Sequence, residues 1–81
     1  MNIEVQLFAA ARDAVGDSPV SVTLSEAATV GELRKRLVQQ FPNLNSMAKV
    51  LLVAVENEYA DDDRSIHESD SVACFPPVSG G

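Results

Sequence analysis

Residues 71–81 read SVACFPPVSGG, and this stretch decides both the predicted fold and the predicted chemistry. Its first five residues are mostly apolar and predict a last β-strand. The two prolines that follow fix φ and favour extended backbone, so we expect them to project the next residues away from the fold. The two glycines lack a Cβ and can pass through a slot too narrow for any other residue. The projecting segment comprises Pro76, Pro77, Val78, Ser79, Gly80 and Gly81.

A terminal Gly-Gly is by itself a weak signal, because chain ends are often frayed or carry a cloning scar. Flexible tails and tags usually include a polar linker. Here the sequence passes from an apolar strand to the glycines without one. Four residues beyond Pro77 reach roughly 13 Å when extended, which is enough to place Gly81 in the active site of a neighbouring protein. We therefore predict a folded domain over residues 1–77 and a flexible, functional tail over residues 78–81.

The first part of the chain predicts two strands that pair with each other. Residues 2–8 and 20–25 both alternate apolar and polar side chains, which is the period of a half-buried strand. We expect these two strands to pair antiparallel. Between them, residues 9–14 are good helix formers, but the run is short before Gly16 and supports one or two helical turns.

The clearest helix start is Thr29-Val30-Gly31-Glu32. The Thr29 hydroxyl can cap the first turn, and Glu32 can reach back to form a capping box. One face of the following residues is apolar, and Pro42 ends the helix. We interpret the basic run 34–36 as the solvated back of this helix. The apolar face consists of Val30, Leu33, Leu37 and Phe41.

The second half of the chain predicts three more strands. Residues 43–49 predict a loop, with or without a helical turn. The unbroken apolar run 50–55 predicts a strand covered on both faces, or on one face with a short partner on the other. Glu56 and Asn57 form a turn, residues 58–60 a short return strand, and residues 61–70 a polar connection. The order of elements favours an α+β fold, a mixed sheet of about five strands packed on one main helix.

Two arrangements fit that order. If the last strand lies parallel beside the first, the fold is the β-grasp of ubiquitin-like proteins. A ferredoxin-like split βαβ unit would need a second full helix near residues 61–70, and the acids and serines there do not supply one. The β-grasp is therefore the predicted fold.

Composition limits the partners. At 81 residues and 46% hydrophobic the chain is an ordinary small globular domain, and its net charge is −6. Seven of the twelve acids lie in residues 56–70 beside one base, Arg64. Such a surface repels phosphate backbones, so nucleic-acid binding is disfavoured. The acids either keep the protein soluble or steer a basic protein partner toward it.

A self-contained active site is not expected. Cys74 is the single cysteine and lacks companions at metal-ligand spacing, so we predict no metal and an intracellular, cytoplasmic home. The sequence has no phosphate-binding glycine loop, and no apolar run of 18 residues predicts a membrane segment. The lone His67, in an acidic loop, is interpreted as exposed and idle. Any chemistry therefore belongs to Gly81.

Four segments of the chain resemble the small, sulfur-carrying subunits of molybdopterin synthases. Three departures from that pattern, Glu56, Ser69 and Cys74, fall on two turns and one packing position. The resemblance implies a β-grasp fold and spans nearly the whole length. The four segments are VQLFAAARDAVG (5–16), TVGELRKRL (29–37), VAVENEY (53–59) and DSVACFPPVSGG (70–81).

The resemblance also implies a reaction and its partners. A separate ATP-using adenylyltransferase or sulfurylase would adenylate Gly81, and sulfur would replace one oxygen to give a thiocarboxylate, a 1-thioglycine. Inside the large synthase subunit, with which the chain would form a heterotetramer, this sulfur would pass to cyclic pyranopterin monophosphate. The resemblance implies that the chain itself binds no cofactor. The matching docking residues are Phe8, Tyr59 and Phe75. A sulfur carrier of the thiamine pathway and a ubiquitin-like protein modifier remain alternatives.

Overall fold

A computed structural model of the chain describes residues 1–77. In chain order its elements are β1 (Asn2–Leu7), α1 (Ala9–Val15), β2 (Val20–Thr23), α2 (Val30–Gln40), the short 3-10 helix η1 (Pro42–Leu44), β3 (Leu52–Val55), β4 (Glu58–Tyr59) and β5 (Val72–Phe75).

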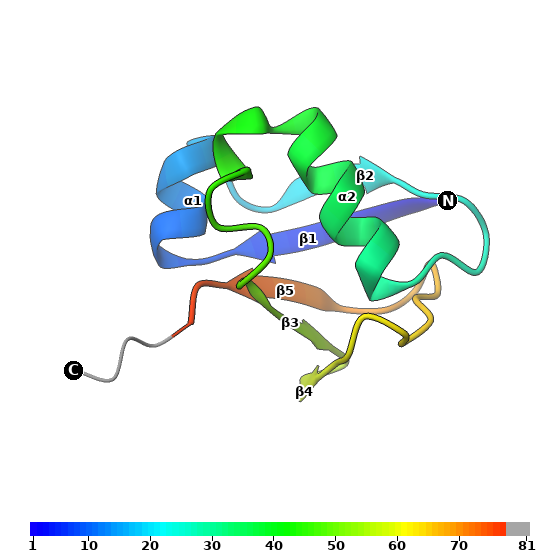
Figure 1. Cartoon of the computed structure of the whole chain (residues 1–81). Coiled ribbons are helices and arrows are strands. Elements are labelled where there is room, and N and C mark those ends of the chain that lie inside the picture. The colour runs from blue at the N-terminus through cyan, green and yellow to red at the C-terminus, as the bar shows by residue number, and fades with distance from the viewer. Residues whose placement is uncertain (78–81) are drawn as a thin grey trace.

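One mixed sheet joins all five strands in the order β2-β1-β5-β3-β4. β1 and β2 pair antiparallel, as the alternation predicts. β5 lies parallel to β1, with Val5 opposite Val72 and Leu7 opposite Cys74. This central parallel pair confirms the predicted β-grasp (Figure 1). Residues 61–70 contain no helix, so the alternative fold lacks its second helix.

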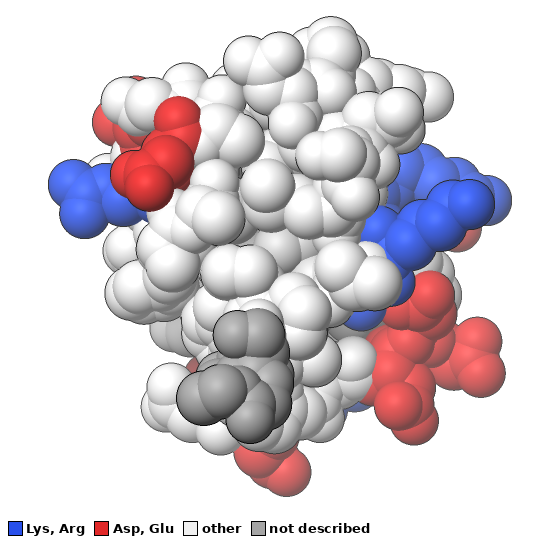
Figure 2. Space-filling view, turned by 60° about the vertical axis from the view of Figure 1, so that its left-hand side comes forward, with Lys and Arg blue, Asp and Glu red and all other residues white. Residues whose placement is uncertain are grey.

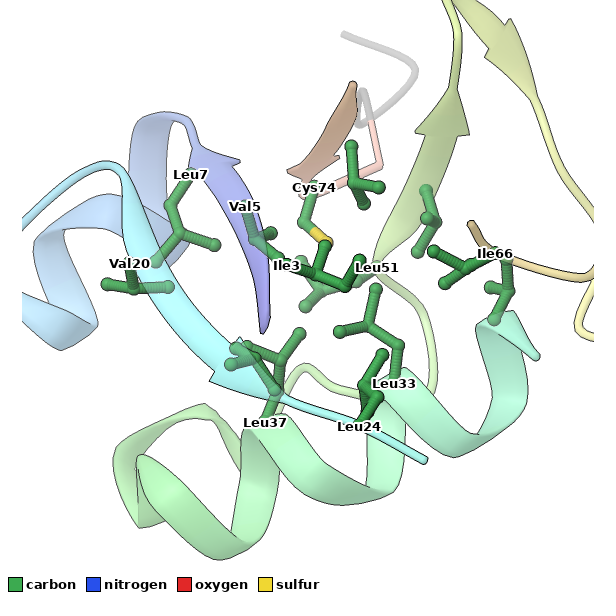
Figure 3. Packing of buried hydrophobic residues seen from close by; sticks show 14 of the residues in the cluster. Ile3, Val5, Leu7, Val20, Leu24, Leu33, Leu37, Leu51, Ile66 and Cys74 are labelled. Carbon is green, nitrogen blue, oxygen red and sulfur yellow. The ribbon is translucent and has the colours of Figure 1, made fainter. Parts of the chain in front are cut away.

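The hydrophobic core lies between the sheet and α2. Ile3, Val5 and Leu7 from β1 point toward Leu33 and Leu37 of α2, with the sulfur of Cys74 among them (Figure 3). All of these side chains are at most 1% exposed. The period-2 pattern of β1 and the helical spacing of α2 therefore meet on one face of the sheet.

Local chemistry fixes both ends of α2. The Thr29 hydroxyl accepts a hydrogen bond from the backbone N–H of Glu32 at 3.3 Å, as predicted. The backbone N–H groups of Val30 and Gly31 donate to the carbonyls of Arg64 and Asp62. The start of the helix is thereby tied to the connection that leads to β5. At the other end Phe41 caps the helix and Pro42 begins η1.

The strand predicted over residues 50–55 is shorter and less covered than expected. β3 begins at Leu52, and its core-facing residues Val53 and Val55 are buried. Leu52 is 36% exposed and Val50 is 56% exposed. Helices cover one face of the sheet (Figure 1), so of the two predicted arrangements coverage on both faces is wrong. The other arrangement, coverage on one face with a short partner strand, agrees with the two-residue β4 beside β3, and Ala54 is buried as well.

Arg34 also differs from its interpretation as part of a solvated helix back. Its side chain is only 18% exposed, and its Nε lies 2.7 Å from Asp62 Oδ1. Its NH1 donates to the backbone carbonyl of Ala48 at 2.8 Å. Lys35 and Arg36 are exposed as predicted. Arg34 differs because the chain segments around residues 48 and 62 both come within reach of the middle of α2.

Candidate docking face and tail exit

The face of the sheet that helices leave uncovered is apolar at one end. Register places Phe75 of β5 opposite Leu52 of β3, and Ala73 opposite Ala54. Phe8 directly follows β1 and donates its backbone N–H to the carbonyl of Cys74 at 3.2 Å. Because alternate residues of a strand point to opposite faces, the side chains outside the core gather here.

Phe8, Tyr59 and Phe75 form an aromatic cluster on this face. The ring centroids of Phe8 and Phe75 are 5.7 Å apart, and those of Tyr59 and Phe75 are 5.9 Å apart with the rings nearly perpendicular. Phe8 is 47% exposed and Tyr59 73%, while Phe75 is half-buried between them. Exposed aromatic rings in mutual contact are typical of a protein-binding surface.

The other end of the same face is polar. A shallow hollow of about 350 Å³ is lined there by Glu4, Gln6, Asn57, Asp70 and Ser71, together with apolar neighbours that include Phe8. The adjacent β3–β4 turn has positive φ at both Glu56 (53°) and Asn57 (67°). Glu56 and Ser71 hold this turn against β5 through reciprocal hydrogen bonds of 2.8 and 3.1 Å. The face thus changes from apolar to acidic along the strands.

The projecting segment starts beside the aromatic cluster. β5 ends at Phe75, and Pro76 and Pro77 are the last described residues. Val78, Ser79, Gly80 and Gly81, named above as tail and reactive residues, lie outside the described part. Figure 2 shows that the centre of this end of the molecule is largely free of charged side chains, while acidic and basic side chains lie at its edges. The boundary between domain and tail stays a prediction.

Cys74 and His67, the potential nucleophile and the potential base of the chain, are not part of the aromatic cluster. Cys74 is fully buried, and desolvation raises the pKa of its thiol to about 12, against a smaller lowering by the charge of Arg34. His67 is 76% exposed, with Nδ1 3.6 Å from Asp70 Oδ2. Both placements agree with the predicted core cysteine and exposed histidine.

Within residues 1–77 no group of three or more His, Cys, Asp or Glu side chains is arranged to hold a metal ion. Over the same range, no helix has the length and apolar character needed to cross a membrane.

The sequence pattern of the ThiS family matches residues 5–81 of this chain. The chain belongs to the ThiS family. Over its full length the chain is similar to the molybdopterin synthase sulfur carrier subunits of Arabidopsis thaliana and Caenorhabditis elegans. The first is 31% identical over 100% of this chain and 84% of its own length. The second is 31% identical over 100% of this chain and 99% of its own length.

Among solved structures, this ThiS-family chain is similar to SAMP1, the small archaeal modifier protein 1, of Haloferax volcanii. The crystal structure of SAMP1 superposes with a TM-score of 0.84 and 31% identity, covering 100% of both chains. The family, the relatives and the topology all agree with the predicted β-grasp.

Leu52 is the member of the open face that sequence reasoning missed. It lies within an unbroken apolar run, which has no alternation to separate a core face from an exposed one. Its position became clear only from its register opposite Phe75. The three aromatic residues were named from the resemblance, and the structure brings them together.

Proposed function

We propose that this chain is the sulfur carrier subunit of a molybdopterin synthase and acts in molybdenum cofactor biosynthesis. The observation that carries the proposal is its match to named sulfur carrier subunits over its whole length. The aromatic cluster beside the tail supports it, because a carrier must dock on a partner while presenting its last residue. A cytoplasmic location is part of this proposal and stays a prediction.

The chemistry starts at the carboxylate of Gly81. A terminal carboxylate is ionised at neutral pH and is a poor acyl donor, so it needs activation. In the proposed cycle a separate adenylyltransferase uses ATP to form an acyl-adenylate and releases pyrophosphate. A sulfur nucleophile then displaces AMP, and a thiocarboxylate remains. The chain's own sequence has no phosphate-binding loop, which fits activation by a partner.

Delivery takes place in a second complex. The thiocarboxylate sulfur attacks cyclic pyranopterin monophosphate in a pocket of the large synthase subunit, whose side chains move the protons. Water then cleaves the thioester bond to Gly81, so that the sulfur stays on the pterin and the Gly81 carboxylate is regenerated. Keeping sulfur on a tethered tail holds it at a high effective concentration beside the acceptor. The chain would thus contribute the reacting sulfur and no acid or base of its own, within a heterotetramer of small and large subunits.

Docking would use the aromatic cluster. Phe8 and Tyr59 present large rings that are already held against Phe75, so little side-chain entropy is lost when a partner covers them. Buried aromatic anchors of this kind dominate many protein interfaces. Since the projecting segment starts at Pro76, next to Phe75, a partner that covers the cluster is also within reach of Gly81.

A second candidate function is protein modification. The observation that favours it is the similarity to the small archaeal modifier protein 1 over the full length of both chains. A modifier would be joined through Gly81 to lysine side chains of other proteins. The two functions share an activated Gly81 and differ in the acceptor.

Intact mass spectrometry tests the proposal. The chain is purified from cells with and without the activating enzyme. We expect an oxygen-to-sulfur mass change at Gly81 only where that enzyme is present, followed by transfer to the pterin precursor on addition of the large subunit. Lysine-linked conjugates without sulfur transfer would favour the modifier. Transfer only to a thiazole precursor of thiamine would favour the thiamine pathway.

A further inference from the structure

The edge of the sheet has a notch next to the aromatic cluster. β4 is only two residues long and ends at Tyr59, whereas β3 extends further along this edge to Leu52. Ala60 still donates its backbone N–H to the carbonyl of Val53 at 2.9 Å, and the chain then leaves the sheet. The missing strand length leaves a hollow of about 480 Å³. Its apolar walls are Leu52, Val53, Tyr59 and Ala60.

Charged side chains also line this notch. Arg34, Asp61 and Asp62 complete its lining. The guanidinium of Arg34 is already engaged, since it bonds to Asp62 Oδ1 and to the carbonyl of Ala48. The carboxylate of Asp61 is exposed and bonds to no side chain or backbone group among residues 1–77. The notch therefore combines apolar walls with one carboxylate, that of Asp61, that has no bonding partner among residues 1–77.

Residues 56–70, which supply part of the notch, are mainly acidic. Residues 56–70 carry seven acids and a single base, in a chain of net charge −6. Figure 2 shows a group of acidic side chains at the lower right, with Lys and Arg side chains directly above it. A partner surface with basic residues on the matching side would be attracted to this acidic group, and an acidic one would be repelled.

We infer that the notch receives a lysine or arginine side chain of the protein that covers the aromatic cluster. The aliphatic part of that side chain would lie along Leu52 and the ring of Tyr59, and its charge would meet Asp61. This inference rests on the proposed function, so the partner is the large subunit of molybdopterin synthase. It adds the orientation of that partner, with its basic residue on the β4 side of the cluster.

The shape and the charge of the notch together favour a basic occupant. A purely apolar side chain would leave Asp61 desolvated without a partner, which is costly for a carboxylate. An acidic side chain would meet like charge from both Asp61 and its neighbours. A basic side chain with a long apolar stem satisfies both parts of the notch. Leu52 connects the two sites, because it lies opposite Phe75 and also lines the notch.

Binding kinetics with the purified large subunit test this inference. The variants are Asp61→Lys, Asp61→Asn and the matched control Asp13→Lys, which makes the same charge change on the exposed surface of α1. Circular dichroism confirms that each variant is folded. We expect Asp61→Lys to lower the association rate about tenfold at low salt and to raise the dissociation rate several-fold. Asp61→Asn should show a smaller change of the same sign, and Asp13→Lys should change either rate by about twofold or less.

Each outcome separates the inference from the proposed function. If the unaltered chain binds the large subunit and Asp61→Lys behaves like Asp13→Lys, the notch has no basic occupant and only this inference is overturned. An effect of Asp61→Lys on association that vanishes at high salt, with an unchanged dissociation rate, would reduce Asp61 to long-range steering and would also overturn it. If the unaltered chain does not bind the large subunit, the proposed function fails first.

Discussion

The ring of Phe75 meets the ring of Tyr59 edge to face, with centroids 5.9 Å apart and an interplanar angle of 83°. Tyr59 is 73% exposed, so this contact and the short β4 strand are what hold it in place. The edge-to-face arrangement is favourable because the positive rim of one ring faces the negative face of the other. An exposed ring that is fixed before binding is well suited to serve as an anchor for a partner.

Truncation of this anchor should weaken docking without unfolding the domain. We expect Tyr59→Ala to raise the Kd for the large synthase subunit roughly 10- to 100-fold, because an aromatic hot spot contributes about 2 kcal/mol or more. Its melting temperature should change little, since the side chain is largely exposed. The matched variant Tyr59→Phe keeps the ring contact and should bind nearly as well. Equal loss in both variants would show that the hydroxyl, and not the ring, is the anchor.

Removal of Arg34 should destabilise the fold more than removal of its neighbour. The Arg34 side chain is 18% exposed and bonds to both Asp62 and the carbonyl of Ala48. Arg34→Ala leaves that part-buried carbonyl without its donor, so we expect a loss of about 1–2 kcal/mol in the free energy of unfolding. Arg36→Ala, on the exposed side of α2, should stay within about 0.5 kcal/mol of the unaltered chain. Urea denaturation measures both, and equal values would contradict a structural role for Arg34.

Asp62→Asn removes the charge of the other member of this ion pair, and its loss of stability can be compared with that of Arg34→Ala. Asp62 is 60% exposed, so solvent screens its charge, and we expect a smaller loss than for Arg34→Ala. An equal or larger loss in the same urea titration would indicate that the ion pair outweighs the bond to Ala48.

Stability should fall in alkaline solution because of Cys74. Burial raises the pKa of its thiol from 9.0 to about 12, so between these values the folded state keeps a proton that the unfolded state loses. The stabilisation is complete below about pH 9 and declines as the pH rises toward 12, by up to about 1.4 kcal/mol per pH unit. Chemical denaturation at several pH values should show a steeper decline for the unaltered chain than for Cys74→Ala. Parallel curves would contradict the raised pKa.

The N-cap of α2 can be tested independently of any partner. The Thr29 hydroxyl accepts the backbone N–H of Glu32, so Thr29→Ala should lower the free energy of unfolding by about 1 kcal/mol. Thr29→Ser retains an accepting hydroxyl and should lose less. A thermal melt distinguishes the two, and identical melting temperatures for Ala and Ser would argue against the cap.

Local patterns predicted most of the fold. The alternation of residues 2–7, the cap at Thr29 and the proline at 42 each act over a few residues, and the structure has the corresponding elements. The sequence did not predict the parallel pairing of β5 with β1 by itself; the β-grasp was predicted on the condition that these two strands pair in this way. This pairing depends on contacts between the two ends of the chain, which no local pattern encodes.

The candidate site was only partly predictable, because it too depends on contacts between residues that are distant in sequence. Phe8, Tyr59 and Phe75 were named from a resemblance, but their mutual contacts come from three different strands or strand ends. The notch was not predictable, since it exists because β4 ends early while β3 continues. Arg34 was misread as solvated because its partners, Asp62 and Ala48, lie far from it in sequence.

Reconstitution of molybdopterin synthesis with a chain extended by one residue after Gly81 tests the central claim most directly. The assay contains the activating enzyme, a sulfur source, the large subunit and cyclic pyranopterin monophosphate. The unaltered chain should yield molybdopterin, and the extended chain, whose Gly81 carbonyl is locked in a peptide bond, should yield none while binding the large subunit through its unchanged aromatic cluster. Equal product from both chains would contradict the claim that sulfur travels on Gly81.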